Sequence, residues 1–324
     1  MPEGHSIHRV ARQFALHFVG HRVEASSPQG RFAGGAKQLD GRTMTDARAV
    51  GKQMFLEFDH ELWLHVHLGM FGAWDFAGEV TTDLGSASAA RAEASGGIAQ
   101  NEASLSSIGA PRRTRLRMSE QETLRQEQGD DFVEPHFPPE PVGAVRVRLL
   151  TATSVADLRG PTTCEVQLPE QMVASVNKLG PDPLEVKPKE GEERFLANVR
   201  TKPTPIALLL MDQSVVSGIG NVYRAELLFR ARIEPHTPGK QLAEDTIRAL
   251  WKDWTYLLKL GVKTGHMMTM DGLKPAAQKK ALANRADRHW VYHRTGEPCR
   301  VCGTPIAMEV IGGRKLYWCP KDQT

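Results

Sequence analysis

The chain has 324 residues and a formal net charge of +3 at pH 7, with 40% hydrophobic and 24% charged residues. This length allows two or more domains, and the composition is that of a globular protein rather than a disordered or fibrous one. Charged residues among the first twenty argue against a secretory signal peptide, and no apolar run is long enough to span a membrane. Four cysteines are too few for a secreted disulfide framework, so we expect a cytoplasmic protein.

The first predicted element is an amphipathic helix that begins directly after Pro2 and Glu3. Its apolar residues recur with a period near 3.6 and form one stripe: Ile7, Val10, Ala11, Phe14 and Phe18. A helix with a buried face would hold the preceding residues in place, although chain termini are usually frayed. Removal of the initiator methionine, which the small residue Pro2 favours, would leave the secondary amine of proline as the N-terminus. We therefore ask whether a fixed terminal amine has a chemical role.

Short β-type runs follow over residues 21–76 and again over 143–168, punctuated by Gly, Pro and Asp. Such runs are typical of an antiparallel sandwich or barrel. A helix predicted over residues 169–179 would close this sheet domain.

An insertion over residues 78–140 separates the two groups of strands. It holds 11 acidic and 6 basic residues, so it is net −5 and the rest of the chain is net +8. The segment is rich in Ser, Ala, Gly, Glu and Gln, and its aromatic residues are Phe132 and Phe137 only. Because such a composition buries too little apolar area to offset the entropy of ordering, we expect a mostly disordered insertion within one sheet domain. Its RRTRLR run could touch phosphates transiently; the alternative is a solvated linker without function.

Residues 180–193 are predicted to be a linker rich in Pro, Gly and charge, and residues 194–262 are predicted to be helical. Within the helical part, the turn SGIG separates two helices, and the second begins at Asn221. Glycines that expose backbone N–H groups at a helix start provide a site for a phosphate. A dinucleotide-binding fingerprint is excluded because the motif follows a helix and no βαβ unit surrounds it. The alternative is a plain helical hairpin with a glycine turn.

The last predicted unit is a zinc ribbon at the C-terminus. Cys299 and Cys302 form a CxxC motif, and Cys319 opens a second knuckle, CPKD, after a hairpin-like stretch. The fourth ligand position is occupied by Asp322 instead of a cysteine. A carboxylate oxygen is a known zinc ligand, so three thiolates and one carboxylate could hold a structural Zn²⁺ ion. The alternative is that the metal has been lost and packing alone holds the hairpin.

Four motifs occur in this order along the chain: MPEG at the N-terminus, GK at 51–52, SGIGNVYRAELLF, and GRKLYWC inside the ribbon. Together they resemble the formamidopyrimidine-DNA glycosylase/endonuclease VIII family of bifunctional DNA repair enzymes. The opening PEGH is similar to the endonuclease VIII branch, and to its actinobacterial members in particular. Apart from the insertion, the resemblance covers nearly the whole chain.

The resemblance implies an α+β multidomain protein with DNA in the cleft between two halves. The domains expected are an N-terminal catalytic antiparallel β-sandwich with flanking helices over 1–180, a helix–two-turns–helix DNA-binding domain over 190–285, and a zinc-ribbon β-hairpin over 286–324.

The resemblance also implies roles for individual residues. Pro2 matches the nucleophile of the family and Glu3 its acid. Lys52 matches the catalytic-site lysine that touches phosphates beside the lesion. Asn221 and Arg314 match the two residues that grip the phosphates flanking the extruded nucleotide.

The chemistry explains why these residue types are needed. An α-amino group has a pKa of roughly 7.7–8.0, against about 10.4 for lysine, so more of it is unprotonated and able to attack the sugar C1′. A secondary amine gives an iminium ion with the opened sugar, through which the 3′ and then the 5′ phosphate can be eliminated. Glu3 is placed to protonate the ring oxygen as a general acid. The target nucleotide must leave the stack, and clamping both adjacent phosphates offsets that cost.

The loop HLGMFG is expected to fill the space that the extruded nucleotide leaves. Met70 and Phe71 follow a predicted strand, and apolar wedges of this kind hold an unstacked step open. The match to the family is looser here, because Gly69 stands where the endonuclease VIII branch can have a polar residue. The alternative is that Met70 packs in the core.

Two histidine pairs could suggest a metal or phosphate site. His65 and His67 alternate on one strand face, but no third ligand is near them in sequence, so buried core histidines are favoured. His289 and His293 are spaced i, i+4 in a possible helix, and we assign them to packing or to phosphate contact.

The sequence thus predicts a monomeric bifunctional DNA glycosylase/AP lyase of the bacterial cytoplasm and nucleoid, acting on double-stranded DNA with oxidised bases or abasic sites. Pyrimidine lesions are favoured, with strand cleavage by β,δ-elimination through a Pro2 Schiff base. One alternative is a catalytically weak relative that recognises damaged or abasic sites, because a ribbon loosened by the missing cysteine would misplace Arg314. A zinc-ribbon interaction protein unrelated to DNA would leave Pro2, Glu3 and Asn221 without a purpose.

Overall fold

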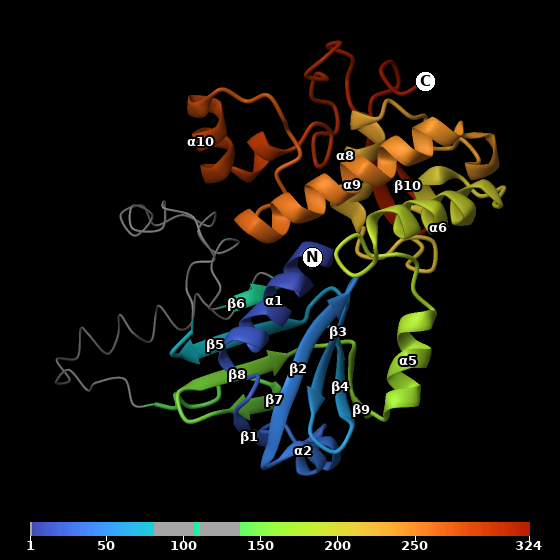
Figure 1. Cartoon of the computed structure of the whole chain (residues 1–324). Coiled ribbons are helices and arrows are strands. Elements are labelled where there is room, and N and C mark those ends of the chain that lie inside the picture. Colours follow the sequence, from blue (N-terminus) through green and yellow to red (C-terminus); the bar gives the residue numbers. More distant parts are fainter. Residues whose placement is uncertain (1, 81–106, 111–136) are drawn as a thin grey trace, which may run out of the picture.

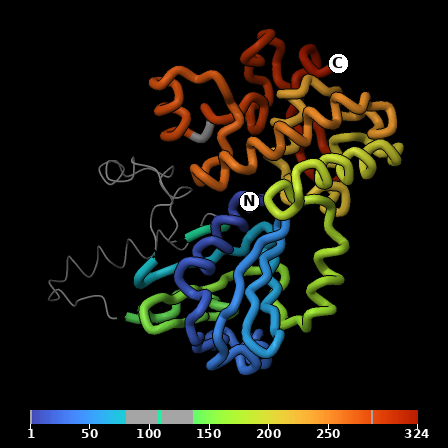
Figure 2. Tube along the Cα trace, in the orientation of Figure 1, coloured from blue at the N-terminus to red at the C-terminus, as the bar shows by residue number. Residues whose placement is uncertain are grey.

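A computed structural model describes residues 2–80, 107–110 and 137–324, and these form two halves stacked one above the other (Figure 1). One half is a β-sheet domain, and the other contains helices and the C-terminal hairpin. The N-terminal segment lies where the two halves meet, as the trace in Figure 2 also shows. No helix in these described ranges is both long and apolar enough to cross a membrane.

Helix α1 (Gly4–His17) joins the two halves. All five residues of its predicted apolar stripe are buried, with Phe18 following directly as the C-cap. The helix packs against strands of the sheet and also against the long helix α9 (Glu244–Thr264) of the other half. The predicted amphipathic helix is therefore present, and its contacts with both halves fix the residues that precede it.

The sheet domain is built from nine described strands, and all neighbouring strands pair antiparallel. Their bounds are β1 (Arg22–Ser26), β2 (Arg42–Val50), β3 (Gln53–Phe58), β4 (Leu62–His67), β5 (Ala73–Gly78), β6 (Ser107–Gly109), β7 (Val145–Leu150), β8 (Ser154–Arg159) and β9 (Thr163–Gln167). The spatial order is β6-β5-β8-β7-β1-β2-β3-β4-β9. A short helix α2 (Ala33–Leu39) links β1 to β2.

The sheet encloses one apolar core between its two ends. Strands β3 and β4 contribute Leu56 and Leu64 to this core, and β5 and β8 contribute Trp74 and Leu158, all buried in a single cluster with α1. The two ends of the sheet therefore face one another, which is the arrangement of the predicted sandwich. Helix α5 (Pro169–Asn177) covers the outer face through Met172, as expected for a closing helix.

Strand β6 differs from the prediction for the insertion. Ile108 pairs with Trp74 of β5 and is 6% exposed, so at least this short piece of residues 78–140 is ordered against the sheet. The local composition is polar, and one isoleucine at a strand edge is too weak a signal to predict it. Residues 78–80 and 137–140 of the predicted insertion are also described, whereas residues 81–106 and 111–136, including the RRTRLR run, lie outside the described residues.

The helical half begins earlier than the sequence indicated. Its helices are α6 (Pro188–Arg200), α7 (Ile206–Leu209), α8 (Asn221–Arg230), η2 (Gly239–Gln241), α9, α10 (Pro275–Ala283) and η3 (Arg285–Arg288). Residues 188–193 were expected in a linker but form the first turns of α6. Pro188 is compatible with the first helical position, Glu190 suits the positive N-terminal end, and Gly191 packs closely on Trp251.

The C-terminal hairpin has the predicted form. Strands β10 (Ala307–Ile311) and β11 (Arg314–Trp318) pair antiparallel around the turn Gly312–Gly313, where both residues have positive φ. Strand β11 packs against α8, and this contact brings the start of β11 close to Asn221.

The predicted helix containing His289 and His293 is absent, since His293 has a φ of +61°, which a right-handed helix does not allow. His289 is buried and its Nε2 lies 3.2 Å from the carbonyl oxygen of Met267, while the His293 ring lies 5.3 Å from that of Tyr317. Both histidines therefore have packing roles.

Candidate active site and metal centre

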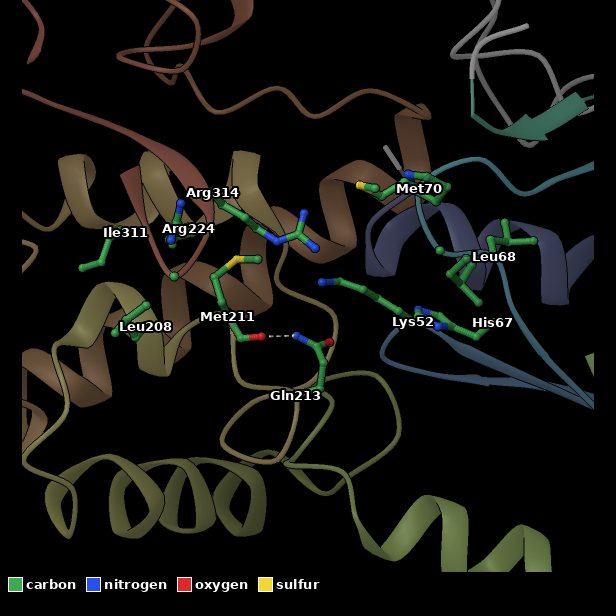
Figure 3. A pocket seen from close by; sticks show the side chains of 14 residues that line it. Lys52, His67, Leu68, Met70, Leu208, Met211, Gln213, Arg224, Ile311 and Arg314 are labelled. Atoms are coloured by element: carbon green, nitrogen blue, oxygen red, sulfur yellow. Dashed lines mark hydrogen bonds between the residues drawn. The ribbon is translucent and has the colours of Figure 1, made fainter. Parts of the chain in front are cut away.

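A cavity of about 250 Å³ opens where the two halves meet (Figure 3). Both halves line it, and the polar lining comes from the N-terminus, the β2–β3 turn, β4, α8 and β11. The lining residues that matter below are Pro2, Lys52, His67, Met70, Arg224 and Arg314.

The Glu3 carboxylate is fixed by the N-terminus of α8. It is fully buried and accepts hydrogen bonds from the backbone N–H groups of Gly220 (2.9 Å), Val222 (2.9 Å) and Tyr223 (3.3 Å). A helix N-terminus attracts an anion because its first N–H groups have no partner within the helix. The SGIGN turn, predicted to bind a phosphate with these groups, thus uses them for a carboxylate of the same chain.

Glycines allow the two segments to approach so closely. A Cβ atom on Gly220 would lie 2.5 Å from Cδ of Glu3, and one on Gly4 would lie 2.9 Å from Cα of Gly218. The Gly4 N–H also donates to the Gly218 carbonyl at 2.9 Å. These contacts seat Pro2 at the cavity wall, which answers why Pro2 and Glu3 precede the helix.

Lys52 reaches the same loop from the sheet half. Its Nζ donates to the carbonyl of Ile219 at 2.5 Å. Burial lowers the pKa of Lys52 to about 8, while the charge of Glu3 raises it and that of Arg314 lowers it. The side-chain ends of Lys52 and Arg314 point toward one another across the cavity (Figure 3). Two cations from different halves therefore share one small space.

Asn221 and Arg224 form a third polar contact at the cavity. The Asn221 Nδ2 donates to the carbonyl of Lys315 at 2.9 Å, and Arg224 Nη2 donates to Asn221 Oδ1 at 2.5 Å and to the same carbonyl at 3.2 Å. Burial lowers the pKa of Arg224 to about 10, and the charge of Arg314 adds to this effect. Lys52, Arg224 and Arg314 together make the cavity a site for an anion.

Arg224 was missed by the sequence reasoning. It follows Asn221 by three residues on α8, so both side chains lie on one face of the helix. That spacing was visible in the sequence, but an arginine inside an amphipathic helix is usually a solvated residue, whereas this one is 1% exposed.

The two histidines of β4 have different surroundings. His65 is buried, and both of its ring nitrogens have hydrogen-bond partners. Gln53 Oε1 lies 2.9 Å from Nε2, and Glu165 Oε1 lies 3.1 Å from Nδ1. His67 instead lines the cavity, and burial lowers its pKa, with the Lys52 charge as the second cause. The expectation of two core histidines therefore holds for His65 but not for His67.

Met70 and Phe71 are exposed beside the cavity. Their exposed fractions are 51% and 78%, so Met70 does not pack in the core. Met70 lines the cavity itself (Figure 3), and Gly69 with a φ of +62° forms the bend before it. The loop therefore presents two apolar side chains at the mouth of the site.

Four donor atoms of the ribbon converge at one point. They belong to Cys299, Cys302, Cys319 and Asp322, and all lie within 4.8 Å of one another. The Asp322 Oδ2 is 2.9 Å from the Cys299 sulfur, and the sulfurs of Cys302 and Cys319 are 3.5 Å apart. Three sulfurs and one carboxylate oxygen at these separations fit a tetrahedral Zn²⁺ site.

Three sequence families match consecutive parts of the chain. They are the formamidopyrimidine-DNA glycosylase N-terminal domain over residues 1–126, the formamidopyrimidine-DNA glycosylase H2TH domain over 179–271, and the zinc finger found in FPG and IleRS over 296–324. Endonuclease 8 1 of Mycobacterium tuberculosis is 36% identical over 326 residues, covering 100% of both chains.

Solved structures share the fold at lower sequence identity. The formamidopyrimidine-DNA glycosylase of Lactococcus lactis, bound non-covalently to DNA containing an AP site, matches with a TM-score of 0.65 and 22% identity, covering 99% of each chain. The same glycosylase in a complex with DNA containing an oxidised pyrimidine matches equally well, with a TM-score of 0.65, 22% identity and 99% coverage of each chain.

Proposed function

This chain belongs to the formamidopyrimidine-DNA glycosylase/endonuclease VIII family of DNA glycosylases and AP lyases, and on that premise we propose that it excises oxidised bases, pyrimidines above all, and cleaves the strand by β,δ-elimination. Its partner would be double-stranded DNA with oxidised bases or abasic sites, in the bacterial cytoplasm at the nucleoid, with the protein acting as a monomer. The preference for pyrimidines rests on the full-length similarity to Endonuclease 8 1.

Pro2 is the proposed nucleophile. After removal of Met1, its nitrogen attacks C1′ of the extruded nucleotide, and the base departs with the glycosidic electron pair. Opening of the sugar ring then gives an iminium cation. This cation accepts the electron pair of the C2′–H bond when the C2′ proton is lost, and the enamine so formed expels the 3′ phosphate; loss of the C4′ proton then expels the 5′ phosphate in the same way. The seat of Pro2 at the cavity wall, fixed through Gly4 and Gly218, supports this role.

Glu3 is proposed to move the proton in this sequence. The nitrogen of Pro2 loses its proton on forming the iminium, and the neighbouring carboxylate can accept it. Glu3 can then deliver a proton to the ring oxygen as the sugar opens, which is general acid–base catalysis by a positioned side chain. Three backbone N–H groups hold the carboxylate in one orientation, and this supports the assignment.

Lys52, Asn221 and Arg314 are proposed to hold the phosphates around the lesion. In this structure, Lys52 donates to the carbonyl of Ile219 and Asn221 donates to that of Lys315. Both side chains therefore hold their donor atoms close to the cavity. Met70 and Phe71 are the proposed wedge, because they are exposed at its mouth.

We further propose that a structural Zn²⁺ ion is held by Cys299, Cys302, Cys319 and Asp322. A bound ion would fix the base of the hairpin whose turn carries Arg314. The convergence of Asp322 with the three thiols supports an ordered ribbon, and so favours the active enzyme over the alternative of a catalytically weak relative. The expected domain limits, 1–180, 190–285 and 286–324, are retained within this proposal.

The observation that carries the proposal is the seat of Pro2 at the wall of a cationic cavity shared by both halves, with the adjacent Glu3 fixed on the N-terminus of α8. Borohydride trapping tests it, because reduction of the iminium joins protein and oligonucleotide covalently. Duplexes with an abasic site, an oxidised pyrimidine or an oxidised purine would be compared, together with the intact mass of the protein. We expect trapping by the wild type, loss of trapping in Pro2→Gly, and no change in Pro28→Gly, which alters an exposed proline. Equal trapping by Pro2→Gly would refute the nucleophile assignment.

A further inference from the structure

Asp182 is a buried carboxylate that takes no part in the proposed chemistry. It lies in residues 180–187, which connect α5 with α6 and so join the two halves, and it is 1% exposed. Its Oδ2 accepts the backbone N–H of Gly51 at 2.6 Å and lies 2.8 Å from His8 Nε2, while its Oδ1 accepts the N–H of Leu184 at 2.8 Å. One carboxylate thus joins α1, the β2–β3 turn and the connecting segment.

His8 connects this carboxylate to the N-terminal segment. It lies one helical turn after Gly4, where α1 begins, and its side chain is 8% exposed. Beside a carboxylate, Nε2 is the ring nitrogen that carries the proton and donates it. Holding His8 fixes the rotation of α1 about its axis, and with it the direction in which Pro2 and Glu3 leave the helix.

Gly51 connects the same carboxylate to Lys52. Its φ of +60° is a conformation that favours glycine, and an added Cβ would lie 2.6 Å from the Cβ of Ser217 and 2.9 Å from the backbone nitrogen of Gly218. The β2–β3 turn is therefore held between Asp182 on one side and the loop before α8 on the other. Lys52 follows this turn directly and reaches Ile219 of the same loop.

The connecting segment is itself attached to the loop before α8. Ser217 donates through its Oγ to the carbonyl of Gly180 at 2.7 Å and through its N–H to that of Pro181 at 3.1 Å, and Gly180 donates to the Gln213 carbonyl at 2.8 Å. Asp182 is thus held against the loop whose end, Gly220, binds Glu3.

We propose that Asp182 and His8 are positioning residues of the reaction, which set the nucleophile-bearing helix and the Lys52-bearing turn in one fixed relation. The inference rests on the proposed function, because it concerns the distance between Pro2 and Lys52 at the sugar and phosphate. A small displacement of groups that react together lowers the rate far more than it lowers binding, since the rate depends on their alignment.

The test separates the chemical rate from DNA affinity in the full-length protein. The rate is that of borohydride trapping in a single turnover with saturating abasic-site duplex, and the affinity is measured on a duplex with an unreactive tetrahydrofuran analogue. The variants are Asp182→Asn, His8→Ala and His8→Gln, which retains a side-chain donor. The control is Glu190→Gln in the first turn of α6, where the side chain is 57% exposed and lies 4.0 Å from Arg194.

We expect the trapping rate of Asp182→Asn to fall by about ten- to a hundredfold, while its affinity changes by no more than about threefold. His8→Gln should lie closer to the wild type than His8→Ala, and Glu190→Gln should equal the wild type in both measurements. All rates are taken at a temperature well below the melting transition of each variant, so that only folded protein is compared.

An unchanged rate in Asp182→Asn and His8→Ala, or a rate and affinity that fall in equal proportion, would overturn the inference. If Asp182→Asn does not fold, the pair of His8 variants decides by the same criterion. Absence of trapping in the wild type would instead mean that the proposed function has failed, so the two failures are distinguishable.

Discussion

The two walls of the cavity are built by different means. On one wall, Glu3 and Lys52 are held by backbone groups of the other half, through close approaches that glycines permit. On the other wall, the side chains of Arg224 and Asn221 hold one another, and both donate to the Lys315 carbonyl in the strand that begins with Arg314. A backbone-held group is sensitive to added atoms, because the approach leaves no space. A side-chain-held group is sensitive to atoms removed, since each contact depends on one functional group.

The largest effect is expected from adding one methyl group to the backbone-held wall. In Gly220→Ala, the new Cβ would lie 2.5 Å from Cδ of Glu3, so the carboxylate must leave its three N–H donors. We expect the single-turnover trapping rate to fall at least about a hundredfold, because a displacement near 1 Å at reacting groups has that effect. Gly34→Ala is the matched control, since it adds a methyl group to a helix with nothing within 4 Å. Near-normal trapping by Gly220→Ala would show that the contact is not needed.

The next effect concerns the base of the side-chain-held wall. Asp322→Ala removes one of the four converging donors, and we expect zinc content by elemental analysis to fall below one equivalent. Affinity for the tetrahydrofuran duplex should fall by about ten- to a hundredfold, because the hairpin carrying Arg314 is no longer fixed. Trapping at saturating DNA should change less, since Pro2 and Glu3 are held elsewhere. Asp322→Cys should retain zinc and affinity; loss of both in that variant would contradict the ligand assignment.

A smaller effect is expected for Arg224→Gln on the same wall. Arg224 is buried, its Nε has no hydrogen-bond partner, and it forms no ion pair within the described part of the chain. Removing its contacts to Asn221 and to the Lys315 carbonyl should weaken binding of the tetrahydrofuran duplex about tenfold. The slope of log affinity against log salt should also become shallower, as one cation is lost from the phosphate site. Arg194→Gln, which removes an exposed arginine from α6, should alter neither quantity.

The difference between the two walls also marks what the sequence could predict. The stripe of α1, the glycine turn before Asn221 and the ribbon cysteines follow from local spacing. The structure places the first two beside the cavity and the cysteines near the C-terminal end of α8. The contact between Asp182 and Gly51 joins residues 131 positions apart, and no periodicity encodes it. The same holds for His67, whose place in the cavity depends on a loop from the other half. Local patterns predict which groups are present, whereas long-range approaches decide how they are held.

The smallest predicted effect is the pH dependence of the lysine on the backbone-held wall. Burial lowers the pKa of Lys52 to about 8, so a rise from pH 7 to pH 8.5 removes its proton in most free molecules. Phosphate binding requires the protonated form, and affinity for the tetrahydrofuran duplex should fall about fourfold over this range. Lys52→Arg, which keeps its charge, should show a flat profile.

The contribution of Lys52 to folding stability does not explain such a decline, because its linkage to pH has the opposite sign. An unfolded lysine has a pKa of about 10.4, so between pH 8 and that value the unfolded chain binds a proton that the folded chain has released. The contribution of Lys52 to the free energy of unfolding therefore increases as pH rises through this window. If DNA binding weakens as the pH rises while the free energy of unfolding stays the same or increases, the decline is assigned to the lysine charge. A profile equally steep in Lys52→Arg would place the titrating group elsewhere.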